Sequence, residues 1–166
     1  DGQVSVEDLE YVVVAFEKAV KSGKIRYWGF NGLGETDAIK SAVNLYSPSG
    51  IHTCYNMINP TSGYSVNDTF PYQNYGELLN ECTKKGIGTV GIRILAGGAL
   101  SGTPDRHPLA LQEVAPIATG GTYQEDVDRT VSYKFLVDEG FVGNLAEAAI
   151  RFAISNTNLS TALIGL

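Results

Sequence analysis

Apolar residues near the start of the chain recur every three or four positions, which is the spacing of a helix with one buried face. The stripe consists of Leu9, Val12, Val13, Phe16, Ala19 and Val20. Ser5, with Asp8 three positions later, resembles an N-terminal capping box, and Gly23 stands where a capping glycine ends many helices. The pattern therefore predicts a helix between Ser5 and Gly23 that packs on a sheet.

Short apolar runs and further helical stripes alternate along the rest of the chain. The runs predict strands at 25–30, 51–55, 89–94 and 161–166. The stripes predict helices at 36–46, 74–85, 125–139 and 144–155, the last capped by Asn144. Two stretches have neither period, namely 56–71 and the proline-rich and glycine-rich stretch 101–122. Loops as long as the second are often functional.

This alternation predicts an α/β fold, since strands that alternate with helices run parallel. The expected architecture is a parallel (β/α) half-barrel of TIM-barrel type, with helices outside four parallel strands. Residues 1–166 are expected to form a single domain with a long loop at about 101–122. Ligands bind at the carboxyl ends of such strands, which directs attention to Asn31, Asn56 and the turn at 93–98.

Composition and charge exclude several classes of function. The net charge of −6 argues against nucleic-acid binding, which needs a basic surface. No apolar run approaches the roughly 18 residues of a membrane span, and no segment resembles a signal peptide, so a cytoplasmic location is expected. Cys54 and Cys82 lack a metal-binding spacing and are expected to pack in the core, with no metal bound.

The length is informative as well. The chain has 166 residues, whereas a complete (β/α)8 barrel typically has roughly 250. It starts at Asp1 without an initiator Met and stops at Leu166 within an apolar strand, and neither end resembles a polar linker. We therefore expect the chain to be a piece of a longer protein.

Four segments, in order, resemble motifs of the aldo-keto reductase family. SGKIRYWGFN at 22–31 is similar to the family's Gly-Lys helix end, Ile/Val-Arg strand and Gly-x-Ser-Asn-like turn. CYNMIN at 54–59 resembles its Gln-x-x-Tyr-Asn-x-x-Asn strand, and 86–102 resembles the next strand with its Pro-Leu-Ala-x-Gly-x-Leu-Thr-Gly turn. Residues 146–166 resemble the last helix and eighth strand. The resemblance implies the C-terminal half of the barrel, strands five to eight.

The resemblance implies part of an NAD(P)H-dependent oxidoreductase that reduces a small-molecule carbonyl by hydride transfer. In this family a Tyr donates the proton, with its pKa lowered by a Lys and its task shared with a His. These residues and a catalytic Asp lie at the ends of strands two to four, upstream of Asp1. No catalytic residue is therefore assigned here, and the chain alone is expected to be inactive. Tyr133-Lys134 and Lys84-Lys85 are predicted to lie on solvated helix faces and do not replace them.

By position, the resemblance also implies cofactor-binding residues for NADP(H) or NAD(H). Asn31 and His52 stand where the family binds the nicotinamide carboxamide, and Ile92 replaces an aromatic that often stacks on the nicotinamide. Arg93 to Gly98 matches the loop that holds the pyrophosphate. The candidate set is Asn31, His52, Ile92, Arg93, Leu95, Ala96, Gly97 and Gly98. Preference for NADP over NAD stays open, because the family's second phosphate anchor follows strand eight.

The pyrophosphate loop has a physical rationale and a simpler interpretation. Backbone N–H groups around Ala96 to Gly98 can cradle phosphate, and the Arg93 guanidinium can pair with it. An unpaired guanidinium is costly to bury, so we expect Arg93 to bind a carboxylate or a phosphate. Gly97-Gly98 is equally typical of an ordinary tight turn, whereas His52 at a strand start is more typical of a packed polar residue than of a cofactor contact. His107, in the long loop, is expected to be solvated.

A different class of function remains open. Four parallel strands leave open edges near 26–30 and 161–166, together with an inner face expected to be apolar, and such edges invite pairing. Two copies could form a homodimer through these edges and close a symmetric barrel. A further alternative is a non-catalytic subunit that binds a partner or the cofactor without turnover.

Overall fold

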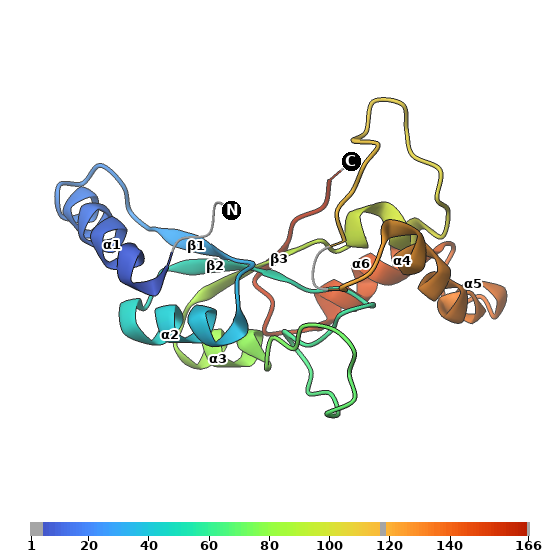
Figure 1. The fold of residues 1–166 in the computed structure, drawn as a ribbon, viewed down its shortest axis with the longest axis horizontal. Coiled ribbons are helices and arrows are strands. Elements are labelled where there is room, and N and C mark those ends of the chain that lie inside the picture. The colour runs from blue at the N-terminus through green and yellow to red at the C-terminus, as the bar shows by residue number, and fades with distance from the viewer. Residues whose placement is uncertain (1–4, 117–118, 166) are drawn as a thin grey trace.

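Helices and strands alternate along the chain as the periodicity predicts. The computed structural model describes residues 5–116 and 119–165 (Figure 1). The strands are β1 (Gly29–Gly32), β2 (Gly50–Cys54), β3 (Gly88–Ile92) and β4 (Thr161–Ala162). The α-helices are α1 (Val6–Lys21), α2 (Thr36–Tyr46), α3 (Leu78–Lys84), α4 (Tyr123–Arg129), α5 (Phe135–Asp138) and α6 (Leu145–Ser155). Two 3-10 helices, η1 (Ala96–Ser101) and η2 (Thr130–Tyr133), complete the order.

All four strands run parallel, in the sheet order β1-β2-β3-β4. Strands that are consecutive along the chain are therefore also neighbours in the sheet, as in one side of a (β/α) barrel. The register aligns Gly29 with Gly50 and Gly50 with Gly88. The predicted α/β fold with four parallel strands is confirmed.

Several helix ends were correctly predicted. The Ser5 hydroxyl accepts the N–H of Asp8 at 3.0 Å and caps α1, while Gly23 has a φ of 71° at its other end. The Asn144 side chain accepts the N–H of Glu147 at 2.8 Å and caps α6. Short polar side chains at these positions satisfy amides that have no partner within the helix.

Other predicted boundaries were wrong, for local reasons. β1 begins at Gly29 rather than at 25, because the N–H groups of Lys24 and Ile25 donate to the Ala19 carbonyl and close the end of α1. α3 begins at Leu78 rather than at 74, because Gly76 and Glu77 have positive φ. The helix predicted at 125–139 starts at Tyr123 and is divided into α4, η2 and α5. β4 ends at Ala162, and Leu166 lies outside the described residues.

One face of the sheet is covered by helices, and this face contains the core (Figure 1). Ile39 and Val43 of α2 pack with Ile51 of β2 and with Leu78 of α3. A second cluster consists of Tyr55, Leu79, Ile94 and Ala153, with Phe152 stacked on Tyr55 at 5.2 Å between ring centroids. This packing holds β2 and β3 in place and so fixes the positions of the loops that follow them.

The predicted packing of α1 on the sheet was wrong. No residue of α1 is buried, and Tyr11 is 80% exposed. The helix instead lies beside α2, where the Tyr46 hydroxyl donates to the Val6 carbonyl at 3.1 Å. It also contacts Trp28, whose ring stacks on Phe16 and whose indole N–H donates to Glu17.

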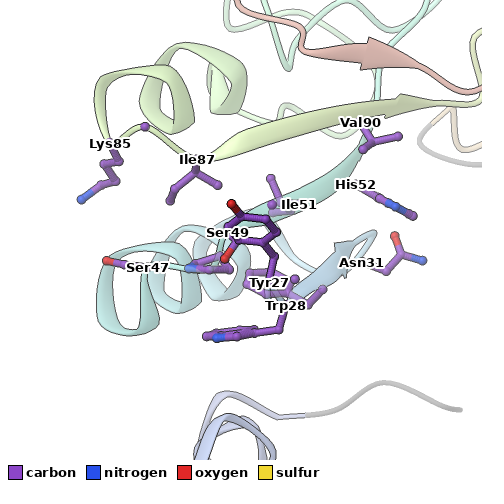
Figure 2. Close-up of a pocket in the computed structure, with 15 residues that line it drawn as sticks. Tyr27, Trp28, Asn31, Ser47, Ser49, Ile51, His52, Lys85, Ile87 and Val90 are labelled. Atoms are coloured by element: carbon purple, nitrogen blue, oxygen red, sulfur yellow. The ribbon is translucent and has the colours of Figure 1, made fainter. Parts of the chain in front are cut away.

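The opposite face of the sheet is open and bears a cavity of about 890 Å³, which we call the open-face cavity (Figure 2). Gly29 and Gly50, which line it, bring no side chain, and Asn31 and His52 are exposed there beside Val90. The expectation of an apolar inner face was therefore wrong, since glycines and two polar side chains occupy much of it.

Candidate functional site

A second cavity, of about 860 Å³, lies at the carboxyl end of β3, and we call it the strand-end pocket. It lies among the end of β3, the turn at η1, the loop before α4 and the segment after β4. Its lining residues are Ile92, Arg93, Ile94, Leu95, Gly97, Gly98, Ser101, Asp105, Arg106, His107, Ala110, Leu111, Tyr123, Leu163, Ile164 and Gly165. Most of the predicted pyrophosphate loop is thus at this pocket, although Ala96 belongs to the same turn without lining it.

Arg93 follows β3 in a left-handed backbone conformation, with a φ of 58°. Such a conformation is uncommon for a residue with a side chain and persists where neighbouring contacts hold it. The Arg93 carbonyl accepts two donors, the Asn56 side-chain amide at 2.9 Å and the Ala96 N–H at 2.8 Å. These contacts fix the backbone from which the guanidinium extends.

Asn56 was expected at the ligand-binding edge, but it is a buried support, with 1% of its surface exposed. Its side-chain oxygen accepts the N–H groups of Ile58 and Asn59 at 2.9 and 2.8 Å. Its amide nitrogen donates to the Arg93 carbonyl. Asn56 therefore joins the ends of β2 and β3 and acts on the pocket only through Arg93.

The Arg93 guanidinium is partly buried at the pocket and has no carboxylate partner. The ion pairs of the described residues involve Lys40, Arg129 and Arg151 instead, and no described residue accepts a hydrogen bond from the Arg93 side chain. Because a partly desolvated guanidinium is stabilised by an anion, this leaves Arg93 suited to a ligand that carries negative charge.

The predicted backbone cradle is only partly available. The Ala96 N–H donates to the Arg93 carbonyl and the Gly98 N–H to the Leu95 carbonyl, each at 2.8 Å, so both amides are used within the turn. Gly97 and Gly98 have φ values of 70° and 110°, which favour glycine. The tight-turn interpretation is therefore correct for these residues, and the groups left for an anion are mainly side chains.

Arg106 is a second cation at the pocket, and the sequence reasoning missed it. Its Nη1 donates to the Gly97 carbonyl at 2.7 Å and its Nε to the Leu111 carbonyl at 2.6 Å. The guanidinium also lies 5.2 Å from the ring centroid of Tyr123. The available signal was an Arg-His pair in a loop long enough to reach back over the strand ends.

His107 also lines the pocket, and its Nδ1 accepts the Leu109 N–H at 3.1 Å. The imidazole thus helps to shape the loop. His107 is exposed in the loop, as expected, and nothing in the sequence indicated its contact with Leu109 or its place at the pocket.

Asn31 and His52 are brought together, but not into the strand-end pocket. They are partners in the register of β1 and β2, and both line the open-face cavity (Figure 2). His52 is also the register partner of Val90, which lies two residues before Ile92 on β3. At about 3.3 Å per strand residue, the two sets of candidates are about 7 Å apart along β3.

The prediction that Tyr133 lies on a solvated helix face was wrong. The Tyr133 hydroxyl donates to the Met57 carbonyl at 2.8 Å, and its ring packs beside Ile58 and Leu100. Burial raises the pKa of this hydroxyl above its ordinary value, with a smaller contribution from Tyr72. A tyrosine that is tied to a carbonyl and made less acidic is poorly placed to act as a catalytic acid.

Both cysteines are buried, in agreement with the prediction that they pack in the core, and neither forms a disulfide in the described part of the chain. Burial raises the pKa of Cys54 to about 12 and that of Cys82 to about 11. Thiols of this kind are protonated at neutral pH and unreactive. Across residues 5–116 and 119–165, no group of three His, Cys, Asp or Glu side chains is arranged to hold a metal ion.

No helix in the described part of the chain is both long enough and apolar enough to cross a membrane.

Comparisons with known proteins identify the family. The model of the Aldo/keto reductase family matches residues 3–166. The fold is similar to aldo-keto reductase AKR11C1 from Bacillus halodurans, with a TM-score of 0.62 for the holo form and 20% identity over 99% of this chain and 48% of that one. For the apo form the TM-score is 0.59, with 21% identity over 95% of this chain and 46% of that one.

Glycerol dehydrogenase AKR11B4 from Gluconobacter oxydans is also similar, with a TM-score of 0.59 and 11% identity over 98% of this chain and 46% of that one. The chain thus spans about half the length of these solved structures. A comparison with curated proteins found no match. The family match covers nearly all of the sequence, and the chain belongs to the aldo/keto reductase family.

Proposed function

We propose that this chain is the strand-five-to-eight half of an aldo/keto reductase barrel and that it binds part of NAD(P)H without supplying the catalytic proton donor. The observation that carries the proposal is Arg93, a partly buried guanidinium at a strand end with no partner among the described residues. It lies in the segment that resembles the family's pyrophosphate loop.

The charges around the strand-end pocket suit a pyrophosphate group. Arg93 and Arg106 both line the pocket. The Arg93 guanidinium can give a phosphate two parallel hydrogen bonds, whereas Arg106 already donates to the Gly97 and Leu111 carbonyls and contributes chiefly its charge. Asp105 also lines the pocket and opposes binding of an anion, so the two arginines have to outweigh one carboxylate. The residues present therefore fit a phosphate-bearing ligand held by side chains more than by backbone amides.

Asn31 and His52 are proposed to bind the nicotinamide carboxamide on the open face of the sheet. Both side chains are exposed in the open-face cavity, where they are partners in the register of β1 and β2 (Figure 2). Each provides groups that can form hydrogen bonds with an amide. Ile92 and Leu95 would give apolar contact between the two ends of the cofactor. A bound reduced nicotinamide supplies the hydride, whereas these residues only bind and orient it.

The proton donor is proposed to lie on residues outside this chain. The resemblance assigns the catalytic Asp, Tyr, Lys and His to strands two to four. The Tyr133-Lys134 pair does not replace them, because the Tyr133 hydroxyl already donates to the Met57 carbonyl. Carbonyl reduction, a small-molecule carbonyl substrate and a cytoplasmic location are accordingly proposals for the whole protein. Residues 1–166 are proposed to form one domain of it.

Cofactor binding can be measured by fluorescence because Trp28 is the single tryptophan and lines the open-face cavity with Asn31. Energy transfer from Trp28 to reduced nicotinamide should give saturable signals with NADPH or NADH. Arg93→Ala should weaken the affinity about 10- to 100-fold, as expected for loss of a charged hydrogen-bonding partner. Arg151→Ala, which removes an exposed arginine from α6, should leave the affinity unchanged. An affinity unaffected by Arg93→Ala would contradict the proposed site.

The second candidate is a half-barrel that self-associates. It is favoured by the edges of β1 and β4, which lack a second partner strand in the described part of the chain. The row of Gly29, Gly50 and Gly88 argues against it, because two copies would bring two sets of glycines into one barrel interior. Barrel interiors are filled by bulky side chains, so such a dimer would be poorly packed.

Sedimentation velocity over a range of concentrations tests this alternative. Closure into a symmetric barrel predicts a stable dimer, whereas the first proposal predicts no specific self-association through the sheet edges. A stable dimer that persists on dilution would favour the second candidate.

A further inference from the structure

Asn31 is the only asparagine of the chain that is followed by glycine. Its side chain is exposed in the open-face cavity, beside His52, and forms no hydrogen bond with any described residue (Figure 2). Gly32 brings no side chain that would hinder an approach to its own amide nitrogen. Asn31 therefore combines an unbonded side-chain amide with an accessible backbone nitrogen on the next residue.

These two groups can react with each other. The Gly32 nitrogen attacks the side-chain carbonyl carbon of Asn31, and the new C–N bond closes a succinimide ring. The side-chain nitrogen leaves as ammonia and takes the proton of the Gly32 amide. Water then opens either C–N bond of the ring and leaves aspartate or isoaspartate. The sum is the uptake of water and the loss of ammonia, and both products carry a carboxylate in place of the neutral amide.

The reaction requires the end of β1 to open, because an extended backbone keeps the Gly32 nitrogen away from the Asn31 side chain. β1 has four residues and pairs only with β2 in the described part of the chain. The turn that follows it is held by Gln73, whose Nε2 donates to the Gly34 carbonyl at 2.8 Å. A short edge strand with so few contacts opens at a low free energy.

Other exposed asparagines lack this combination. Asn44 donates to the Lys40 carbonyl and is followed by a leucine. The side-chain oxygen of Asn67 accepts the Thr69 hydroxyl, and an aspartate follows it. Asn31 should therefore react before them.

We propose that Asn31 is a site of spontaneous deamidation, and that the reaction lowers the affinity of the chain for nicotinamide cofactor as the protein ages. An amide both donates and accepts hydrogen bonds, whereas a carboxylate only accepts them, so a bound carboxamide loses a donor. The effect on the cofactor rests on the proposed function. The reaction itself depends only on Asn31, Gly32 and the opening of β1.

Incubation of the ligand-free chain in warm, mildly alkaline buffer tests the site, with tryptic digestion and mass spectrometry as the readout. The peptide from Tyr27 to Lys40 contains Asn31 as its only asparagine, and its conversion should be at least about tenfold faster than that of Asn44 or Asn67. Conversion of Asn31 no faster than that of Asn67 would overturn the proposal.

Removal of the Gln73 contact tests the opening step. Gln73→Ala should accelerate conversion about threefold or more, as expected for loss of one hydrogen bond. The matched control is Gln124→Ala, which removes an exposed glutamine bonded to Asp128 and should leave the rate unchanged. Should Gln73→Ala fail to fold, the unmodified chain in urea replaces it and should also react faster. An unchanged rate would contradict opening of this strand end.

The effect on the cofactor is tested with Asn31→Asp, which reproduces one product. It should bind NADPH about tenfold more weakly in the Trp28 fluorescence titration. Deamidation of Asn31 without loss of affinity in Asn31→Asp would uphold the modification site and overturn its effect on the cofactor. If Arg93→Ala has no effect on NADPH affinity either, the proposed function fails while the modification site stands.

Discussion

The side-chain amide of Asn56 donates to the main-chain carbonyl of Arg93 at 2.9 Å, across the ends of two adjacent strands. This contact holds an arginine in a left-handed conformation at the base of the strand-end pocket. Asn56 is buried and does not line the pocket, yet it fixes the backbone of Arg93, whose guanidinium has no partner among the described residues.

Replacing Asn56 by Ala should therefore destabilise the protein and disturb the site together. The change leaves buried donors at Ile58 and Asn59 and the carbonyl of Arg93 without this partner, and an unsatisfied buried group costs about 1–3 kcal/mol. Urea denaturation should show a loss in this range or above it. Asn44→Ala, on the exposed face of α2, should change the free energy of unfolding by no more than about 0.5 kcal/mol. Equal losses for both variants would contradict the role given to Asn56.

Gly97→Ala should be strained, because Gly97 has a φ of 70° and an added Cβ would lie 2.6 Å from Cγ1 of Val114. The left-handed conformation alone costs a residue with a side chain about 1–2 kcal/mol. Thermal unfolding should therefore shift to lower temperature. Gly34→Ala provides the control, since its added methyl meets nothing within 4 Å. A variant at Gly97 as stable as that control would show that the turn adapts freely.

Stability should fall in alkaline solution because two buried acids ionise more readily after unfolding. Burial raises the pKa of Cys54 from 9.0 to about 12, opposed by the charge of Arg93, and raises that of Tyr55 from 10.0 to about 12. Each contribution is fully present below the unfolded pKa and is lost as the pH rises towards the folded one. The urea midpoint should therefore drop between about pH 9 and about pH 12. Cys54→Ala should make this drop smaller, and an unchanged drop would exclude Cys54 as a cause.

Arg129→Ala should cost more than removal of an exposed arginine. Arg129 pairs with Asp126, which is 2% exposed, and its guanidinium lies over the ring of Tyr72 at 4.4 Å. Breaking such a pair leaves a buried carboxylate without its cation. The expected cost is about 3 kcal/mol, near the low end of the range for buried ion pairs, because the Arg129 side chain itself reaches solvent. The exposed pair of Arg151 and Glu147 should contribute less than about 1 kcal/mol by the same urea measurement.

The order of elements and the fold class could be predicted because they depend on local periodicity and capping. Ser5 and Asn144 capped the helices expected of them, since a short polar side chain acts on amides only three residues away. The start of β1 could not be predicted in this way. The N–H groups of Lys24 and Ile25 donate to the Ala19 carbonyl at the end of α1, and any sequence can form such backbone hydrogen bonds.

The candidate site was predictable only in part for a similar reason. The family resemblance marked Arg93 and Gly97 by their place in a motif, and both lie at the strand-end pocket. Arg106 lies outside any recognised motif, and its importance depends on how a long loop folds back over the turn. The internal use of the Ala96 and Gly98 amides likewise follows from turn geometry that periodicity does not reveal.

The most direct test of the account is a single titration of the purified chain with NADPH, followed by addition of an aldehyde. The account predicts saturable energy transfer from Trp28 and then no oxidation of the bound nicotinamide, because the chain is proposed to contribute phosphate-binding and carboxamide-binding groups but not the proton donor. Oxidation of NADPH on adding the aldehyde, or the complete absence of binding, would contradict it.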